Sequence, residues 1–355
     1  MRELIFEFSD VYMDEIEEFV SPEDSCMLLG DICINRIAGI AYKNLSRFKN
    51  FRVHKEFVKT LDAVYKENIR KTEHFKRNIK YLSNIFKDAD FSYAFLKGSF
   101  LTTKLYESGC RTSNDIDILI NEKDITNCQN ILLNAGFIQG EFKPGTGIIP
   151  ATRREVIMSR MNFGETIPFI KIIDGEPLCI DLNFSVDFKP AGENQIVPEL
   201  LTNTTEVQFE EVSFRTLNKI DFLIHLCCHL YKEATIINWV RGNRDLQLYK
   251  FSDINIFFHE CILEEDYKEL AKSVAKFGVE KECYYTFENA SVIYPKLKQL
   301  NGYEAMLDEI RPGDLSFMKQ ILDPMDKKLY QYDMTFKEWF LSRKRVNELK
   351  NVEVL

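Results

Sequence analysis

Apolar residues recur at intervals of three and four positions through the first 90 residues of the chain. The spacing is clearest in two runs, which are interleaved with Lys, Arg and Glu: Phe57, Leu61 and Val64, followed by Phe75, Ile79, Leu82 and Phe86. Residues with this spacing lie on one face of an α-helix. The pattern therefore predicts an N-terminal helical region over residues 1–90, whose apolar stripes pack against neighbouring elements.

Between residues 91 and 190 the pattern changes to short β-branched and aromatic runs that are interrupted by Gly and Pro. It predicts strands and helices in this order: a strand entering a turn at 92–99, a helix at 101–108, a strand at 115–120, a helix at 122–136, and two strands at 166–174 and 177–188. The last two strands flank Asp174-Gly175, a dipeptide typical of a hairpin turn. Gly136 is well placed to end the second helix.

Helical spacing returns after residue 190. The clearest segments are residues 220–234, 244–260 and 266–278, and residues 336–350 have the pattern of an amphipathic basic helix that packs against the chain. We therefore predict an α+β fold, in which a small mixed β-sheet core is flanked by N- and C-terminal helical regions. The expected divisions are residues 1–90, 91–190 and 191–355.

The composition is that of a globular protein, with 45% hydrophobic and 28% charged residues in 355. No segment approaches the roughly 18 apolar residues that a membrane span requires, and the N-terminus lacks a basic region followed by an apolar one. We expect a soluble, cytoplasmic protein without a membrane partner. The nine cysteines include no Cys-x-x-Cys pair, so reduced packing thiols are favoured over disulfides or a zinc site.

The predicted strand at 115–120 carries the first candidate chemistry. Asp115 and Asp117 alternate with three isoleucines, so both carboxylates point to one face, roughly 7 Å apart at Cα. Paired carboxylates on a strand can hold two Mg²⁺ ions about 3.5–4 Å apart, an arrangement that serves phosphoryl or nucleotidyl transfer. The alternative is a strand whose first acidic residues only face water, since Asp-x-Asp pairs are common.

Two neighbouring motifs favour the metal interpretation. Upstream, Gly98-Ser99 follows a predicted strand, where free backbone N–H groups and a hydroxyl can receive a phosphate. Downstream, alternation along the last strand puts Asp181, Asn183 and Ser185 on one face. Asp181 could then be a third carboxylate, which takes a proton from an attacking hydroxyl. Its alternative is an exposed Asp in a hairpin.

In this order, Gly98-Ser99, Asp115, Asp117 and Asp181 resemble the nucleotidyltransferase superfamily that includes DNA polymerase β and the aminoglycoside-modifying nucleotidyltransferases. The separation between Gly-Ser and Asp-x-Asp is on the long side for it. The core LKGSFLTTKLYESGCRTSNDIDILI looks closer still to a bacterial family of largely uncharacterised nucleotidyltransferases. With its helical flanks, NRIAGIAYKNL before the core and HLCCHLYKEA and DLQLYKFSDI after it, the resemblance spans roughly residues 35–255.

The resemblance implies transfer of a nucleoside monophosphate from an NTP to an acceptor, with release of pyrophosphate. Asp115, Asp117 and Asp181 would bind two Mg²⁺ ions, with Mn²⁺ as the alternative, and Asp181 would also take the acceptor's proton. Lys97, Gly98 and Ser99 would contact the nucleotide's phosphates. ATP is the expected NTP because it is the most abundant.

Three further cations are candidate nucleotide contacts. Arg111 lies four residues before the Asp-x-Asp strand, where a guanidinium could clamp phosphate oxygens. Lys232 lies on the helix at 220–234, and lysines of the corresponding helix approach the triphosphate in related enzymes. Lys250 shares a face of the next helix with Asp253. The alternatives are a surface Arg and an internal pair between Lys250 and Asp253.

Two other features have no settled role. His225 and His229 share a helical stripe with Lys232, but two His without a third ligand do not make a zinc site, and hydrogen-bonded His at a helix–sheet interface is favoured. Residues 141–166 form a polar stretch containing three arginines. This stretch could cover the site, but a solvated loop is the favoured interpretation.

The acceptor is not fixed by the sequence. A small molecule, a peptide or protein hydroxyl and tRNA each need only an attacking oxygen, and a non-catalytic nucleotide-binding protein is a further alternative. The net charge of −9 argues against nucleic acid, yet residues 43–87 carry thirteen basic and four acidic side chains. We expect this basic face to pair with the acidic N-terminal residues, so an RNA acceptor stays open without being favoured.

Overall fold

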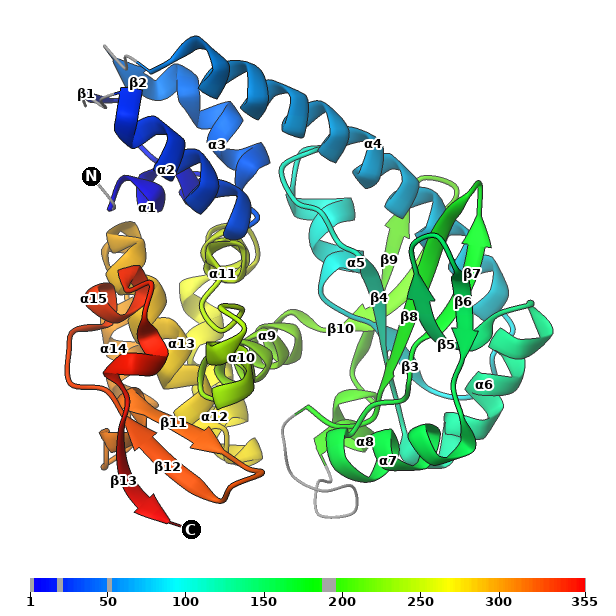
Figure 1. Cartoon of the computed structure of the whole chain (residues 1–355). Coiled ribbons are helices and arrows are strands. Elements are labelled where there is room, and N and C mark those ends of the chain that lie inside the picture. Colours follow the sequence, from blue (N-terminus) through cyan, green and yellow to red (C-terminus); the bar gives the residue numbers. More distant parts are fainter. Residues whose placement is uncertain (1–2, 18–21, 50–52, 187–195, 355) are drawn as a thin grey trace. The chain divides into compact units, whose positions relative to one another are not determined.

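The computed structural model describes residues 3–17, 22–49, 53–186 and 196–354 (Figure 1). Contacts within the chain divide it into two compact units. Unit 1 comprises Met1–Asn68, Gly109–Arg111 and Leu223–Leu355, and unit 2 comprises Ile69–Ser108 and Thr112–Phe222. Two helices, α4 (Lys55–Phe86) and α9 (Lys219–Ala234), contribute residues to both units.

Unit 2 is built on a six-stranded mixed sheet with the strand order β3-β4-β8-β7-β5-β6. β4 and β8 run parallel, and the other neighbouring strands are antiparallel. The strands are β3 (Tyr93–Phe95), β4 (Asp115–Ile120), β5 (Ile138–Lys143), β6 (Gly147–Pro150), β7 (Phe169–Ile173) and β8 (Glu176–Asn183). The helices are α5 (Gly98–Phe100), a π-helical turn (Leu101–Leu105), α6 (Ile125–Asn134), α7 (Arg153–Phe163) and α8 (Ile196–Leu200).

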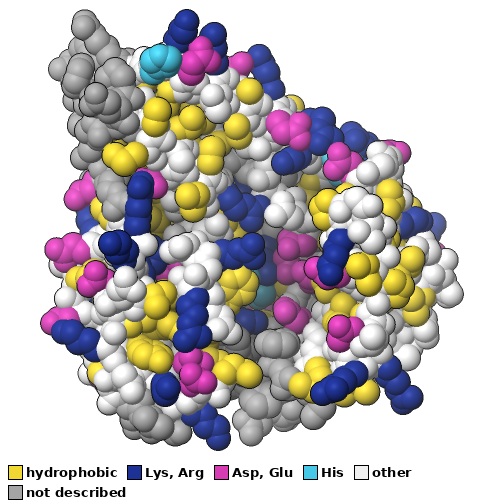
Figure 2. Space-filling model, in the orientation of Figure 1, with side chains coloured by type: hydrophobic (Ala, Val, Ile, Leu, Met, Phe, Trp, Pro, Cys, Tyr) yellow, Lys and Arg dark blue, Asp and Glu magenta, His cyan; other side chains and the backbone are white. Residues whose placement is uncertain are grey.

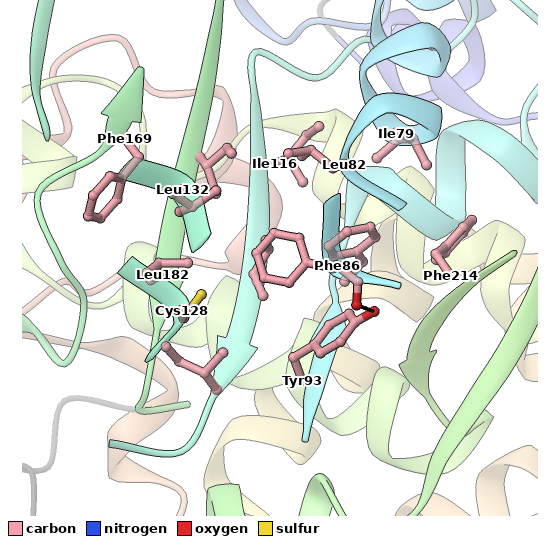
Figure 3. Close-up of a cluster of buried hydrophobic side chains, with 14 of the residues drawn as sticks. Ile79, Leu82, Phe86, Tyr93, Ile116, Cys128, Leu132, Phe169, Leu182 and Phe214 are labelled. Carbon is pink, nitrogen blue, oxygen red and sulfur yellow. Dashed lines mark hydrogen bonds between the residues drawn. The ribbon is translucent and has the colours of Figure 1, made fainter. Parts of the chain in front are cut away.

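One face of this sheet packs against α4 and α6. Side chains alternate along a strand, so Ile116, Ile118 and Ile120 of β4 share a face, and each is at most 1% exposed. They join the apolar cluster drawn in Figure 3, in which α4 supplies Ile79, Leu82 and Phe86 and α6 supplies Cys128 and Leu132. The odd-numbered residues of β4, including both of its aspartates, consequently lie on the opposite face.

Two hairpins complete unit 2. The predicted turn between β7 and β8 is confirmed: Asp174 and Gly175 have φ angles of 52° and 81°, as a type I′ turn requires. A second hairpin, β9 (Thr204–Phe209) with β10 (Val212–Leu217), lies beside β3. There the hydroxyl of Thr216 donates to the carbonyl of Phe95 at 2.6 Å.

Unit 1 is mainly helical. Its own helices are α1 (Leu4–Ser9), α2 (Pro22–Ile34), α3 (Ala38–Asn44), α10 (Ile237–Arg241), α11 (Leu248–Cys261), α12 (Tyr267–Phe277), α13 (Glu280–Ile293), α14 (Tyr303–Glu309) and α15 (Phe336–Leu341). Two short strands, β1 (Ile16–Glu17) and β2 (Phe48–Lys49), pair in parallel. A separate antiparallel sheet contains β11 (Gln320–Asp323), β12 (Lys328–Gln331) and β13 (Lys350–Val354).

The predicted α+β class, with a mixed sheet between helical ends, is confirmed. The division at residues 90 and 190 stays a prediction. No described helix has the length and apolar composition needed to cross a membrane. All nine cysteines are free thiols.

Two sequence interpretations are wrong. Residues 336–350 do not form one helix: α15 ends at Leu341, and a 3₁₀ turn (Arg345–Glu348) precedes β13. Arg345 accounts for the break, because its guanidinium binds the carbonyls of Phe340 and Ser342 and forms a buried ion pair with Asp245. Residues 141–166 are not a solvated loop, since they contain half of β5, all of β6 and all of α7.

We predict that Ile118→Ala lowers the free energy of unfolding by about 2–5 kcal/mol, because it leaves a cavity in the fully buried cluster between the sheet and α4. Guanidinium unfolding monitored by circular dichroism measures the change. The matched control is Ile172→Ala on β7, where 43% of the side chain is exposed and the loss should be much smaller. Equal losses in the two variants would contradict the proposed core.

Candidate active site

Three aspartates meet on the face of the sheet that α4 does not cover. β4 and β8 pair in parallel with Asp117 directly opposite Asp181, and neighbouring strands lie about 4.8 Å apart. Asp115 shares this face two residues before Asp117. Asp117 is 8% exposed, whereas Asp115, at the start of the strand, is exposed to solvent. The strand register therefore brings together the three carboxylates that the sequence singled out.

Two side chains contact the buried aspartate directly. Lys97 Nζ donates to Asp117 Oδ1 at 2.8 Å, and Asn183 Nδ2 approaches the same oxygen at 3.3 Å. Asn183 lies on β8 two residues after Asp181, so it points to the same face. Asn183 was placed on this face by the sequence pattern, but its contact with Asp117 follows only from the pairing of β4 with β8.

The turn after β3 is tightly built. Lys97 has φ 44° and ψ −113°, a conformation that is rare for a residue with a side chain. The next residue must be Gly, because a Cβ at Gly98 would lie 2.0 Å from Ser113 Oγ. Ser99 is 1% exposed, and its hydroxyl has no hydrogen-bond partner among the described residues. A buried hydroxyl without a partner suits a turn that receives a polar ligand.

A fourth carboxylate, Glu165, lies on the same face and was missed by the sequence analysis. Glu165 forms an isolated antiparallel bridge with Asn183, which points its side chain to the face of the aspartates. Gly164 makes this approach feasible: its φ is 64°, and a Cβ there would lie 2.4 Å from Ser185 Cβ. The signal in the sequence was a Gly just after a helix, followed by an acidic residue.

The clustered carboxylates raise the proton affinity of Asp181. Burial raises the pKa of Asp181 well above its ordinary value, and the charges of Asp117, Asp115 and Glu165 raise it further, while Lys97 opposes the shift. Burial alone would lower the pKa of Lys97, but the charge and hydrogen bond of Asp117 outweigh it, and the net shift is upward. Four carboxylates and one ammonium group thus lie on this face, an excess of negative charge that favours binding of additional cations.

The donor set suits Mg²⁺, which prefers carboxylate oxygens. Within the described part of the chain, however, no three acidic, His or Cys side chains already converge on a common metal position. A metal bound through Asp117 Oδ1 would compete with the Lys97 ammonium, which pairs with this oxygen. The residues fit a metal in their chemistry and strand positions, provided that this ion pair opens.

A cavity of about 520 Å³ lies in the same unit and reaches Asp115. Its walls include Phe142 of β5 and Pro177 of β8, and α4 contributes Arg70 and His74. His74 Nε2 is buried and has no hydrogen-bond partner among the described residues. This volume is in the range of pockets that hold small organic molecules.

The other nucleotide candidates belong to unit 1. The Arg111 guanidinium forms a buried two-pronged contact with Asp253, at 3.0 and 3.1 Å, and lies 4.7 Å from the centre of the Tyr249 ring. Lys250 forms an ion pair with Glu233. Lys232 is partly exposed on α9. Their nucleotide roles stay predictions.

The two histidines also lie in unit 1. His225 is buried, and its ring stacks with that of His229 at 6.5 Å between centroids. His229 Nε2 lies 3.4 Å from Glu233, which is also the partner of Lys250. This polar cluster is consistent with a structural role for the His pair.

Comparison with known proteins identifies the family. A family model described as uncharacterised nucleotidyltransferase matches residues 34–295, which include every candidate site residue above. The crystal structure of an antigenic nucleotidyltransferase-like protein from Paracoccidioides brasiliensis is similar with 13% sequence identity and a TM-score of 0.36, over 66% of this chain and 92% of that one. A search of curated proteins finds no match.

We predict a pH-dependent stability difference between wild type and Asp181→Asn in EDTA. Because the pKa of Asp181 is raised in the folded protein, the wild type loses stability as the pH rises above the ordinary value of 3.8. The variant lacks this loss, so its Tm should be the higher at neutral pH, and the two should converge toward pH 3.8. A stability difference that does not change with pH would contradict the prediction.

We also predict that Gly98→Ala destabilises the protein by about 1–3 kcal/mol through overpacking against Ser113. Adding Ser113→Gly should restore part of the loss, because it removes the atoms that the new Cβ meets. Chemical denaturation of all four members of the double-mutant cycle measures this coupling. Gly30→Ala is the control, since nothing lies within 4 Å of its Cβ position. Additive effects of the two changes would refute the contact.

Proposed function

Because the chain belongs to the uncharacterised nucleotidyltransferase family, we propose that it transfers a nucleoside monophosphate from an NTP to an acceptor hydroxyl and releases pyrophosphate. The observation that carries this proposal is the in-register pairing of Asp117 with Asp181, with Asp115 on the same face. The reaction would be that of the DNA polymerase β-like superfamily, which the sequence resembles. ATP is the proposed nucleotide.

The proposed cofactor is a pair of Mg²⁺ ions, with Mn²⁺ as the alternative. Asp115 and Asp117 would hold both ions and Asp181 one of them. When bound, the metals would neutralise charge on the phosphates and the attacking and leaving oxygens. The excess of four carboxylates over one ammonium group in the site supports this assignment, and burial together with the acidic neighbours already raises the pKa of Asp181.

The protein's own residues would supply positioning and proton transfer. Asp181 would accept the proton of the acceptor hydroxyl while that oxygen bonds to the α-phosphorus. The bond from the α-phosphorus to the bridging oxygen breaks, and pyrophosphate leaves with the electron pair. Gly98 and Ser99 would receive the β- and γ-phosphates, and the buried Ser99 hydroxyl supports this, since it lacks a partner among the described residues.

The three cations of unit 1 have unequal support. The Arg111–Asp253 and Lys250–Glu233 ion pairs favour structural roles for both cations, because opening either pair would take a cation away from a buried carboxylate. Lys232 is partly exposed on α9, and its proposed role at the triphosphate rests on the family resemblance. We therefore rank Lys97, Gly98 and Ser99 first among the nucleotide contacts.

A small organic molecule, a peptide and a protein hydroxyl are all retained as proposed acceptors. The cavity of about 520 Å³ reaches Asp115, but it is not lined by Asp117 or Asp181, and it includes Ile116 and Leu178, which belong to the face of the sheet that α4 covers. A non-catalytic protein of this fold would bind the nucleotide without transferring it, and the experiment below separates that alternative.

RNA is the less supported acceptor. Lys and Arg side chains follow α4 but alternate with acidic ones (Figure 2). In unit 2, Arg70 pairs with Glu176, Lys76 with Glu73, and Lys80 with Glu210 and Glu211. The expected pairing with the N-terminal residues is seen in the described part for Lys49 and Glu15. These pairings reduce the positive charge that a phosphate backbone would meet.

We predict that the purified protein with Mg²⁺ and α-labelled ATP releases pyrophosphate and labels a component of cell extract. Asp117→Asn and Asp181→Asn should each reduce the rate by about 100-fold or more, because one removes a metal ligand and the other the proton acceptor. The measurement is label transfer in parallel with pyrophosphate release, repeated with each NTP.

The matched control is Glu122→Gln, which removes an exposed carboxylate of the same unit and should keep the wild-type rate. Resistance of the labelled product to RNase and protease would support a small-molecule acceptor, whereas RNase sensitivity would support RNA. If wild type and both aspartate variants behave identically with every NTP, the enzymatic proposal fails. Binding of NTP without transfer would favour the non-catalytic alternative.

A further inference from the structure

We propose that Lys97 is an internal counter-ion of the metal site, which holds Asp117 in the free protein and moves to the phosphates when metal and nucleotide bind. The inference rests on the proposed function and deepens it, because it assigns a regulation to the same site. It predicts that the metal binds poorly by itself and that nucleotide and metal strengthen each other's binding.

The ion pair occupies a position that a metal needs. Lys97 Nζ lies 2.8 Å from Asp117 Oδ1, and the side chains are only 17% and 10% exposed. Mg²⁺ binds carboxylate oxygen at about 2.0–2.1 Å. An ammonium group and a divalent cation on the same oxygen would repel each other strongly in this poorly solvated place. Binding of a metal through Asp117 Oδ1 therefore requires that Lys97 leave this oxygen.

Moving the Lys97 ammonium away from Asp117 costs free energy unless the ammonium pairs with another anion. A charged group that is largely removed from water is stable only when it is paired. Lys97 immediately precedes Gly98-Ser99, the turn proposed to receive the nucleotide's phosphates. A flexible four-carbon stem anchored there could turn from Asp117 to a phosphate oxygen with its backbone in place. The nucleotide phosphates thus give Lys97 a new anionic partner. Without nucleotide, a metal at Asp117 would leave Lys97 with no such partner.

The backbone around Lys97 is fixed well enough for such an exchange. The Leu96 N–H donates to the carbonyl of Asp117 at 3.0 Å, which ties the turn to β4. The Lys97 carbonyl accepts hydrogen bonds from the N–H groups of Phe100 and Leu101. These bonds hold Lys97 in a backbone conformation that is rare for a non-Gly residue. The strained, anchored backbone leaves the side chain as the part that moves.

A purely structural role makes the opposite prediction. If Lys97 only stabilised the fold of the carboxylate cluster, its removal would disturb the site and weaken every ligand. If Lys97 competes with the metal, its removal strengthens metal binding and weakens nucleotide binding. The two roles therefore predict opposite changes in metal affinity, so a binding measurement distinguishes them without any measurement of activity.

The experiment measures Mn²⁺ binding to the full-length protein by electron paramagnetic resonance, with and without the non-transferable analogue α,β-methylene-ATP. For wild type, the analogue should increase Mn²⁺ affinity about tenfold or more. Lys97→Met should bind Mn²⁺ alone about tenfold more tightly than wild type, and the affinity of the Mn²⁺-saturated variant for the analogue should fall by a similar factor. Lys97→Arg, which keeps the charge, should bind Mn²⁺ alone as weakly as wild type.

The exposed lysine variant Lys123→Met is the matched control and should behave as wild type in both titrations. Unchanged or weaker Mn²⁺ binding by folded Lys97→Met would overturn the inference and leave the proposed function standing. If Asp117→Asn binds Mn²⁺ as tightly as wild type, the metal site itself is wrong, and the inference falls with it. Should Lys97→Met not fold, the wild-type titrations decide, because the absence of coupling between Mn²⁺ and the analogue contradicts the exchange.

Discussion

The parallel pairing of β4 with β8 is the constraint on which the candidate active site depends. This pairing sets Asp117 opposite Asp181, and it also brings Asn183 within reach of Asp117. The same alternation that exposes these polar residues buries Ile118 and Leu182 against the helices on the other face. A shift of one residue would move the carboxylates into the apolar cluster, so hydrophobic burial fixes the register that the chemistry requires.

The concentration of acidic groups on one face of the sheet creates an excess of negative charge, which other groups of the site neutralise. Burial and the charges of Asp117, Asp115 and Glu165 disfavour ionisation of Asp181 and raise its pKa. Lys97, in the turn after β3, neutralises part of this charge, and the proposed metal ions would neutralise the remainder. The negative charge of the site would therefore be fully neutralised only when metal ions are bound, which links the stability of the folded protein to metal binding.

Much of the fold could be predicted because its signals are local. Alternation marked β4 and β8, the Asp174-Gly175 dipeptide marked the hairpin of β7 with β8, and Gly136 marked the end of α6. Features that depend on distant partners could not be predicted. Glu165 reaches the aspartates only through its bridge to Asn183, and the helix expected at 336–350 is broken by an ion pair between Arg345 and Asp245.

The connection between β4 and β8 has a consequence for how the protein is made. Asp117 and Asp181 are adjacent in space but 64 positions apart in sequence, and α6, α7 and three strands lie between them. Contacts between such distant positions form late and slowly, because a long loop must close before they gain any stability. Before β8 has emerged from the ribosome, the nascent chain already contains the apolar face of β4 but lacks the strand that pairs with it. The nascent unit thus exposes an unpaired, isoleucine-rich strand edge, which is a hazard for aggregation during synthesis.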